Sequence, residues 1–205
     1  MPNRRQLMIF AAALLPGLPV IARSAAAQGA VATKAADFVR QTGDKLVAVV
    51  NGPGTPQSKR PTLTNIIEQA VDVDGVAQFC LGRFWRVATP EQKKRYIDLF
   101  HQVLVTNITG KLGEYQGVRF EMGRSQLQDD TAKVATVVER PNNPPTNVDW
   151  IISNPAEDPK IIDVVAEGTS LRLTQRSDYM SYLAHNNNSI DTLINAMHQQ
   201  VQQAG

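Results

Sequence analysis

Residues that could perform acid, base or nucleophilic chemistry are few in this sequence and widely spaced. The histidines His101, His185 and His198 lack a metal-binding spacing of the HExxH kind, so we expect each in a surface or core role. No glycine-rich loop of the Walker or dinucleotide-binding type occurs, which argues against a nucleotide site. The single cysteine, Cys80, excludes a disulfide within the chain, and its apolar neighbours favour burial over reactivity.

Two further groupings could support catalysis, and both are better explained by local structure. Ser170 lacks the second glycine of a nucleophile elbow, and it follows an expected strand without opening a helix. Asp72 and Asp74 could form an acid–base pair, but beside a helix start we expect them to cap the helix or face solvent. The sequence therefore predicts a protein that is not an enzyme and holds no metal ion or cofactor. A metal-independent hydrolase, with carboxylates that converge only in three dimensions, is the enzymatic alternative.

Residues 1–27 have the composition of a secretory signal. Arg4 and Arg5 precede an apolar run, and small residues before Gln28 suit cleavage there. The start also resembles a twin-arginine signal, with the ordinary secretory route as the alternative. An uncleaved anchor is the other interpretation, but the apolar run is short and interrupted by prolines. We therefore expect a protein that is exported to the periplasm.

Export changes the charge balance of the chain. The sequence has 21 basic and 19 acidic residues, but three of its arginines belong to the signal segment. Residues 28–205, which we expect to form a single domain, carry 18 basic and 19 acidic side chains. Because nucleic-acid binding depends on an excess of positive charge near the phosphates, the sequence predicts no nucleic-acid partner.

The first half of this domain has the periodicity of helices. Apolar residues recur every three or four positions over residues 31–49, and the glycine- and proline-rich residues 51–56 end that helix. The best-marked helix begins at Thr89, which can form a capping box with Gln92, and it is expected to end near residues 115–117. Shorter helices are expected over residues 63–71 and 74–82, and two more, separated by residues 186–188, close the chain.

Between these helices the hydrophobicity alternates with a period of two. The turn at Asp129-Asp130 separates the first two runs, and Leu171 and Leu173 continue the alternation after a bend at Gly168. The four longer strands are expected over residues 118–122, 132–138, 148–152 and 162–166. Helices, strands and helices in this order indicate an α+β fold, in which a twisted antiparallel sheet of four to five strands packs against the N- and C-terminal helices.

One string of residues is distinctive: Leu81-Gly82-Arg83-Phe84-Trp85-Arg86-Val87-Ala88-Thr89-Pro90-Glu91-Gln92. This string resembles the MlaC (toluene-tolerance) family of periplasmic lipid-binding proteins. The same resemblance holds for residues 72–80, for the end of the central helix at residues 115–117, for residues 163–171 and for the tetrapeptide at residues 176–179. The resemblance extends over nearly all of residues 28–205. The departures from the family pattern are more similar to its hopanoid-associated branch, HpnM. They are Asn107, Pro159-Lys160 and Thr174-Gln175-Arg176.

This resemblance implies a deep apolar cavity between the sheet and the helices, where family members carry a lipid with its tails inward. It also implies partners. Family members shuttle their lipid between an outer-membrane lipoprotein complex and an inner-membrane ABC transporter with an MCE-domain subunit. The departures leave two lipids open for this chain, a phospholipid or a polycyclic hopanoid.

We expect the lipid contacts to come from one face of the sheet and from the helices that face it. The expected lipid floor consists of Phe120, Val134, Val148, Trp150, Val164 and Leu171. The expected helical wall consists of Tyr96, Phe100, Val103 and Leu104, with Phe84 and Tyr179 as further aromatic lining. Arg83 and Arg86 are candidates for contacts to a headgroup or a partner, with structural salt bridges as the alternative.

The same residues are compatible with a different class of function. Each of these aromatic side chains could equally fill a closed core. A periplasmic adaptor that docks on a membrane complex without carrying lipid is therefore the alternative to a lipid carrier.

Overall fold

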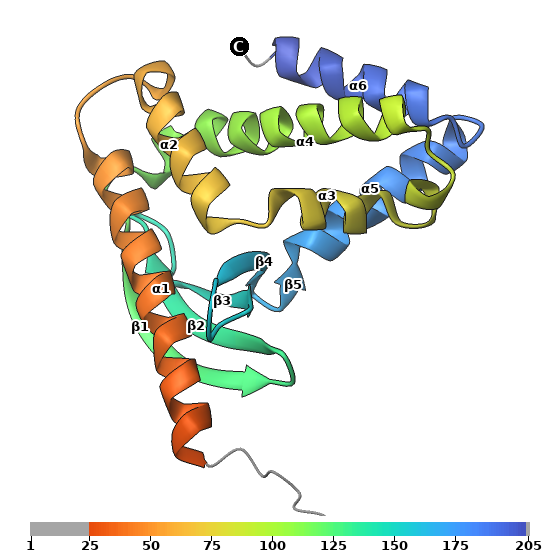
Figure 1. The fold of residues 1–205 in the computed structure, drawn as a ribbon. Helices are drawn as coiled ribbons and strands as arrows, with labels where there is room; N and C mark the ends of the chain where they lie inside the picture. The colour runs from red at the N-terminus through yellow and green to blue at the C-terminus, as the bar shows by residue number, and fades with distance from the viewer. Residues whose placement is uncertain (1–24, 204–205) are drawn as a thin grey trace, which may run out of the picture.

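Helices begin and end the part of the chain that the structure describes, residues 25–203, and a sheet lies between them in the sequence (Figure 1). The order of elements confirms the predicted α+β class. In this computed structural model the elements before the sheet are α1 (Ala25–Asn51), α2 (Pro56–Ala70), α3 (Val73–Leu81), the 3-10 helix η1 (Gly82–Arg86), α4 (Pro90–Gly110) and the 3-10 helix η2 (Leu112–Tyr115). The strands and last helices are β1 (Arg119–Gln128), β2 (Thr131–Glu139), β3 (Thr146–Ser153), β4 (Lys160–Ala166), β5 (Thr169–Ser170), α5 (Leu171–His185) and α6 (Ile190–Gln203).

The expected signal segment lies outside the described residues except for its last three, which belong to the start of α1. None of the helices within residues 25–203 has the length and apolar character that a bilayer crossing needs.

The sheet is an antiparallel meander of five strands in the order β1-β2-β3-β4-β5. The predicted turn at Asp129-Asp130 joins β1 to β2, and Asp129 takes a left-handed conformation with φ 52° that aspartate tolerates better than most residues. The register shifts between Met122 and Ser125 on β1, which is one edge of the sheet. Such a bulge interrupts the hydrogen-bonding edge and makes it a poorer template for another strand.

One face of the sheet is apolar, and helix α1 covers much of it. Side chains of three neighbouring strands align on this face, since Trp150 pairs with Val134 on one side and with Val164 on the other. Helix α1 runs along β1 and β2 (Figure 1), and its Ala35 and Val39 are buried in the same cluster as the sheet residues. This sheet core depends on α1, because β2, β3 and β4 bury apolar side chains that need a packed helix to shield them from water.

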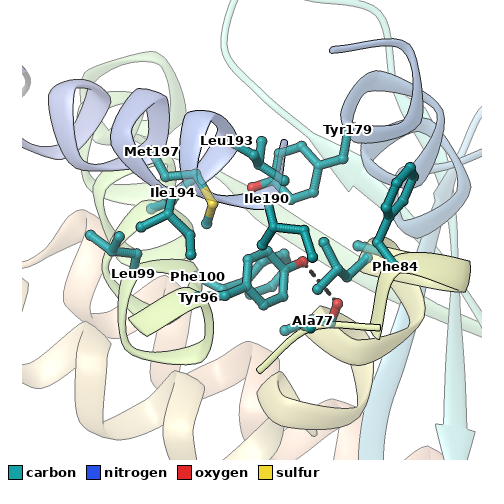
Figure 2. Packing of buried hydrophobic residues seen from close by; sticks show 14 of the residues in the cluster. Ala77, Phe84, Tyr96, Leu99, Phe100, Tyr179, Ile190, Leu193, Ile194 and Met197 are labelled. Carbon is teal, nitrogen blue, oxygen red and sulfur yellow. Dashed lines mark hydrogen bonds between the residues drawn. The ribbon is translucent and has the colours of Figure 1, made fainter. Parts of the chain in front are cut away.

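A second core lies among the helices, and its buried residues all come from helices and the segments that connect them. At its centre, Tyr96 and Phe100 of α4 lie beneath α6, and Tyr179 reaches in from α5 (Figure 2). Helix α4 packs against α6, α2 and α3. Burial of Leu183 and Met197 completes this helical core.

The two cores meet where α2 ends and α3 begins. Val71 forms an isolated parallel bridge with Ile161 of β4, and the Asp72 N–H donates to the carbonyl of Ile161 at 3.0 Å. Val71 is half-buried and packs against both cores. The helical core is therefore joined to the sheet by this backbone contact, by α2 and by α5, which follows β5 directly. Helices α1 and α2 are also linked to the start of the sheet by a third, smaller cluster, which consists of Val50, Leu63 and Val118.

The predicted start of α4 is confirmed, and its predicted end is wrong. The Thr89 hydroxyl accepts from Gln92 N–H at 3.1 Å while the Gln92 side chain accepts from Thr89 N–H at 3.0 Å, which is a full capping box. The α-helix ends at Gly110, however, and a 3-10 turn follows over η2. Glycines at positions 110 and 113 explain the early end, because glycine is among the poorest helix formers.

The predicted continuation of the sheet through Leu171 and Leu173 is also wrong. Both residues lie in the first turn of α5 and are 53% and 57% exposed. Ser170 caps this helix, since its hydroxyl accepts from Leu173 N–H at 3.0 Å, so Ser170 does open a helix. A reversal at Gly168, which has φ 78°, lets the chain leave the sheet after only two residues of β5.

Removal of the α4 cap should destabilise the fold. In Thr89→Ala the oxygen that accepts from Gln92 N–H is lost, so we expect the free energy of unfolding to fall by about 1 kcal/mol. Urea unfolding followed by circular dichroism measures this difference. Thr62→Ala, at an exposed position inside α2, is the matched control and should change the stability by less than about 0.5 kcal/mol. Equal losses in the two variants would mean that the cap contributes nothing.

The contact between α4 and α6 should depend on pH. Asp191 accepts hydrogen bonds from Gln92 Nε2 at 2.8 Å and from Arg95, and these bonds hold the pKa of Asp191 below its ordinary value. A lowered pKa stabilises the folded state above the unfolded-state pKa, and this effect is lost as the pH falls through the folded-state pKa. We therefore expect Asp191→Asn to lower Tm at pH 7, and this difference to disappear as the pH falls through the folded-state pKa of Asp191. Thermal unfolding at several pH values tests this, and a difference that does not change with pH would contradict it.

Candidate functional site

Five of the six residues of the expected lipid floor lie on the apolar face of the sheet, as their alternation predicts. Val134 and Val148 are buried there, whereas the other three remain partly exposed. These three are Phe120, Trp150 and Val164. The register places them on β1, β3 and β4, so the partly exposed surface extends across the sheet. The sixth expected residue, Leu171, is not part of this face because it lies in α5.

The polar atoms of this face are paired within the sheet. The Trp150 indole Nε1–H donates to Thr136 Oγ1 at 2.9 Å, and Thr136 Oγ1 in turn donates to the Val148 carbonyl at 3.1 Å. Satisfied in this way, the indole presents only its apolar ring surface. Around Trp150 and Thr136, the face can therefore contact a hydrocarbon without leaving a hydrogen-bond donor unpaired.

The expected helical wall faces other helices instead of the sheet. Tyr96, Phe100 and Val103 are buried in the helical core, and Leu104 is half-buried against it. The rings of Tyr96 and Phe100 have centroids 5.9 Å apart, and Tyr179 meets them edge-on at 6.2 and 6.3 Å. Figure 2 shows the Tyr96 hydroxyl donating to the carbonyl of Ala77, a bond of 2.8 Å. These rings are thus locked into a well-packed core.

The floor and the wall are therefore not brought together in this structure. Phe84 and Tyr179, the further aromatic lining, belong to the same helical core as the wall. The sheet face is covered by α1 and by the end of α2, whose Ala70 is buried in the sheet core. In sequence both sets are apolar stripes, and the alternation alone cannot say which stripe packs against which.

Two grooves of about 200 Å³ each open on the surface of the domain. One lies between α1 and α2 and is lined by Phe38, Gln41, Thr42, Lys45, Ile66, Gln69 and Ala70. The other lies between α5 and α6 and is lined by Asp178, Tyr179, Tyr182, Leu193, Ala196, Met197 and Gln200. Both are smaller than the pockets of about 300 Å³ or more that enclose drug-sized ligands. Of the expected contact residues, only Tyr179 lines either groove.

Arg83 and Arg86 lie on η1 and are exposed. Within residues 25–203 neither forms a salt bridge, and the Arg83 guanidinium lies over the Phe84 ring at 5.0 Å. A structural ion pair therefore does not explain either arginine. Their contact with a headgroup or a partner stays a prediction.

Asp163 is a residue that links the sheet to the helices, and it was not singled out from the sequence. Asp163 of β4 is buried, and its carboxylate accepts from Val164 N–H at 2.8 Å, Arg172 N–H at 3.0 Å and Ser170 Oγ at 2.6 Å. The signal that could have indicated it is a lone acidic residue in a strand that is apolar except for Lys160 at its start. Asp163 ties β4, β5 and the first turn of α5 into one unit.

The geometry so far is that of an apolar sheet face beside a helical core, and a comparison with protein families agrees with it. The model of the MlaC family, described as MlaC protein, matches residues 40–199. The chain belongs to the MlaC family. This match spans both cores, from α1 into α6.

A solved structure confirms the fold of this MlaC family member. A phospholipid-binding protein from Ralstonia solanacearum, solved in complex with a phospholipid, superposes with a TM-score of 0.71 at 22% sequence identity. The match covers 83% of this chain and 98% of that one. At this identity the likeness establishes a shared fold.

Nothing in the described part of this MlaC family member gathers the groups that metal chemistry requires. Among residues 25–203 there is no group of three or more histidine, cysteine or acidic side chains that could hold a metal ion. Burial raises the pKa of Tyr96 and Tyr179 above the ordinary value, so both phenols stay protonated. The Tyr179 hydroxyl has no hydrogen-bond partner among the described residues.

The thiol of Cys80 should be inert in the folded protein. Burial raises its pKa to about 12, and it donates weakly to the Arg172 carbonyl at 3.6 Å. Since the thiolate is the reactive form, we expect no reaction with a maleimide at pH 8 and rapid reaction after unfolding in guanidinium. Mass spectrometry of the adduct measures both rates. Labelling of the folded protein as fast as that of the unfolded protein would contradict the burial.

Proposed function

We propose that this protein carries a lipid through the periplasm and shelters the tails against the apolar face of its sheet. The observation that carries the proposal is that face itself, where Phe120, Trp150 and Val164 remain partly exposed in the middle of an MlaC family domain. The shared fold with a phospholipid-binding protein from Ralstonia solanacearum supports the same function. A domain with no other use for these side chains would gain stability by covering them fully.

The physical need for such a carrier is large. Exposure of one methylene to water costs about 0.8 kcal/mol, so exposure of about thirty in a two-tailed lipid costs on the order of 20 kcal/mol. A lipid therefore does not cross an aqueous gap unaided. A carrier must replace the bilayer around the tails during the transfer.

Neither of these two grooves is large enough for two tails, and α1 and the end of α2 cover the sheet face, so the proposed loaded state is more open than this structure. Val134, Trp150 and Val164 of the lipid floor belong to the sheet core, so α1 and the end of α2 are the segments that must move away from the sheet. The helical core is packed as a separate cluster and can stay closed during this movement. Tails that enter along the apolar face would lie under α1, with Phe120, Val134, Val148, Trp150 and Val164 as the lipid floor.

The direction of transport would be set by the partners. A carrier releases its lipid where a partner stabilises the empty state more than the loaded state. As the family resemblance implies, we propose an outer-membrane lipoprotein complex and an inner-membrane ABC transporter with an MCE-domain subunit as those partners. In this proposal residues 1–27 direct export, residues 28–205 form the carrier, and the protein performs no catalysis.

The first experiment is to identify the bound lipid. Protein expressed in its native host from the full sequence is purified, extracted with organic solvent and examined by mass spectrometry. We expect about one lipid for each chain, and its headgroup distinguishes a phospholipid from a hopanoid. If no lipid is extracted, and vesicles fail to load the protein, the carrier function is wrong and the adaptor is the better account.

A bulky side chain on the lipid floor should block the tails. Val164 lies on the apolar face, whereas its neighbour Val165 lies on the opposite face, where it pairs with Asp149. We expect Val164→Trp, and likewise Val148→Trp, to reduce lipid occupancy several-fold, while the matched control Val165→Trp keeps it. Circular dichroism checks that each variant is folded. Unchanged occupancy in folded Val164→Trp and Val148→Trp would disprove this lipid floor.

A further inference from the structure

Two arginines of α5 lie against one aromatic ring of α3. The guanidinium carbons of Arg172 and Arg176 are 4.3 and 4.7 Å from the centroid of the Phe79 ring. The two arginines are four residues apart on the helix, so their side chains leave from the same face. Two like charges are thus held side by side in a partly buried position, which costs energy unless a negative charge compensates them.

The carboxylate next to them compensates only one arginine, and only in part. Asp163 already accepts hydrogen bonds from two backbone N–H groups and from the Ser170 hydroxyl. The Arg172 Nε lies 4.0 Å from Asp163 Oδ2, which is beyond hydrogen-bonding distance. Within residues 25–203 this nitrogen is buried without a hydrogen-bond partner, and no other nitrogen of the Arg172 guanidinium donates to a protein atom.

The Arg176 guanidinium has hydrogen-bond donors that no acceptor among the described residues uses. Its Nη1 donates to the Phe79 carbonyl at 3.2 Å, and it forms no salt bridge with any residue of the described chain. Gly82 makes room for it, because a Cβ at that position would lie 3.2 Å from Arg176 Nη2. The backbone of Gly82, with φ 56° and ψ −127°, is also one that glycine adopts most easily. The chain thus keeps a small residue beside the guanidinium.

We propose that Arg172 and Arg176 form a binding site for a phosphate group between α3 and α5. Guanidinium groups bind phosphate through paired N–H donors, and this pair offers several donors that no protein acceptor uses. The site carries two positive charges against the single carboxylate of Asp163. The phosphate can be that of a lipid headgroup or of a free anion, and these two sources share the same chemistry.

The lipid-headgroup form of this proposal rests on the proposed function and makes it more specific. Asp163 precedes Val164 of the lipid floor on β4, so its side chain lies on the opposite face of the sheet, where it accepts from the Arg172 backbone N–H. The site therefore lies behind the lipid floor, next to the edge of the sheet formed by β4 and β5. A lipid whose tails lie on the floor could bring its phosphate to the two arginines by passing around this edge, and it would then satisfy both regions. A hopanoid hydrocarbon without phosphate would leave the arginines unused.

The test compares three probes that differ in phosphate and in tails. Inorganic phosphate, a short-chain phosphatidylglycerol and the diacylglycerol with the same chains are titrated into 15N-labelled full-length protein, and the arginine Nε–H signals are followed by NMR. We expect both phosphate-bearing probes to shift the signals of Arg172 and Arg176. The signal of Arg124, exposed on β1, should not move.

Variants separate a binding role from a structural one. We expect Arg176→Gln and Arg172→Gln to weaken phosphatidylglycerol binding about tenfold or more and to leave diacylglycerol binding unchanged. The matched control Arg124→Gln should bind both lipids as the wild type does. Arg176→Lys, which keeps the charge but loses the planar fork, should lie between the wild type and Arg176→Gln. Arg172→Gln could fail to fold because it loses the guanidinium beside Asp163. In that case Arg176→Gln and the NMR signals of the wild type still test the phosphate site.

The outcomes separate this site from the proposed function. If both lipids bind equally well and the glutamine variants change neither, the phosphate site is wrong and lipid carriage stands. If inorganic phosphate shifts the two arginines but no lipid binds, the anion site is right and the carrier function is wrong. If phosphatidylglycerol shifts them and inorganic phosphate does not, the headgroup is the ligand. If no probe moves these signals, the site is wrong whether or not lipid binds.

Discussion

A buried carboxylate joins the two halves of this domain. Asp163 accepts hydrogen bonds from its own strand, from the Ser170 hydroxyl and from the first turn of α5. Because an unpaired buried carboxylate is very costly, these three donors must stay where they are. Helix α5 therefore leaves the sheet in a fixed direction, and Tyr179 and Leu183 reach the helical core from it. This junction and the bridge between Val71 and β4 together set the position of the helical core relative to the sheet.

The separation of the two cores is what makes a carrier function physically reasonable. Each core buries its own apolar residues, so α1 can move away from the sheet without opening the helical core. A single continuous core would resist such a movement, because packed interiors lose contact energy throughout when they are opened. In the proposed function, a hydrocarbon ligand replaces missing protein contacts on the partly exposed sheet face around Trp150.

Most polar groups inside the domain are paired, and the exceptions are informative. Tyr96 donates to Ala77 and Trp150 donates to Thr136, so these rings offer only apolar surface to their neighbours. Among the described residues, two buried side-chain atoms lack a partner, Arg172 Nε and the Tyr179 hydroxyl. Arg172 lies beside a second cation, Arg176. Two neighbouring guanidinium groups with unused hydrogen-bond donors are a stronger indication of an anionic ligand than a lone hydroxyl.

The sequence by itself determined the elements and their faces. The capping box at Thr89, the turn at Asp129-Asp130 and the alternation along β1 to β4 follow from local rules of hydrogen bonding and side-chain direction. Only the tertiary structure decided which apolar stripes meet, because the stripe on α4 would fit a sheet as well as it fits α6. Leu171 shows the same limit, since two alternating leucines are too few to distinguish a strand from a helix that a distant carboxylate, Asp163, holds at its first turn.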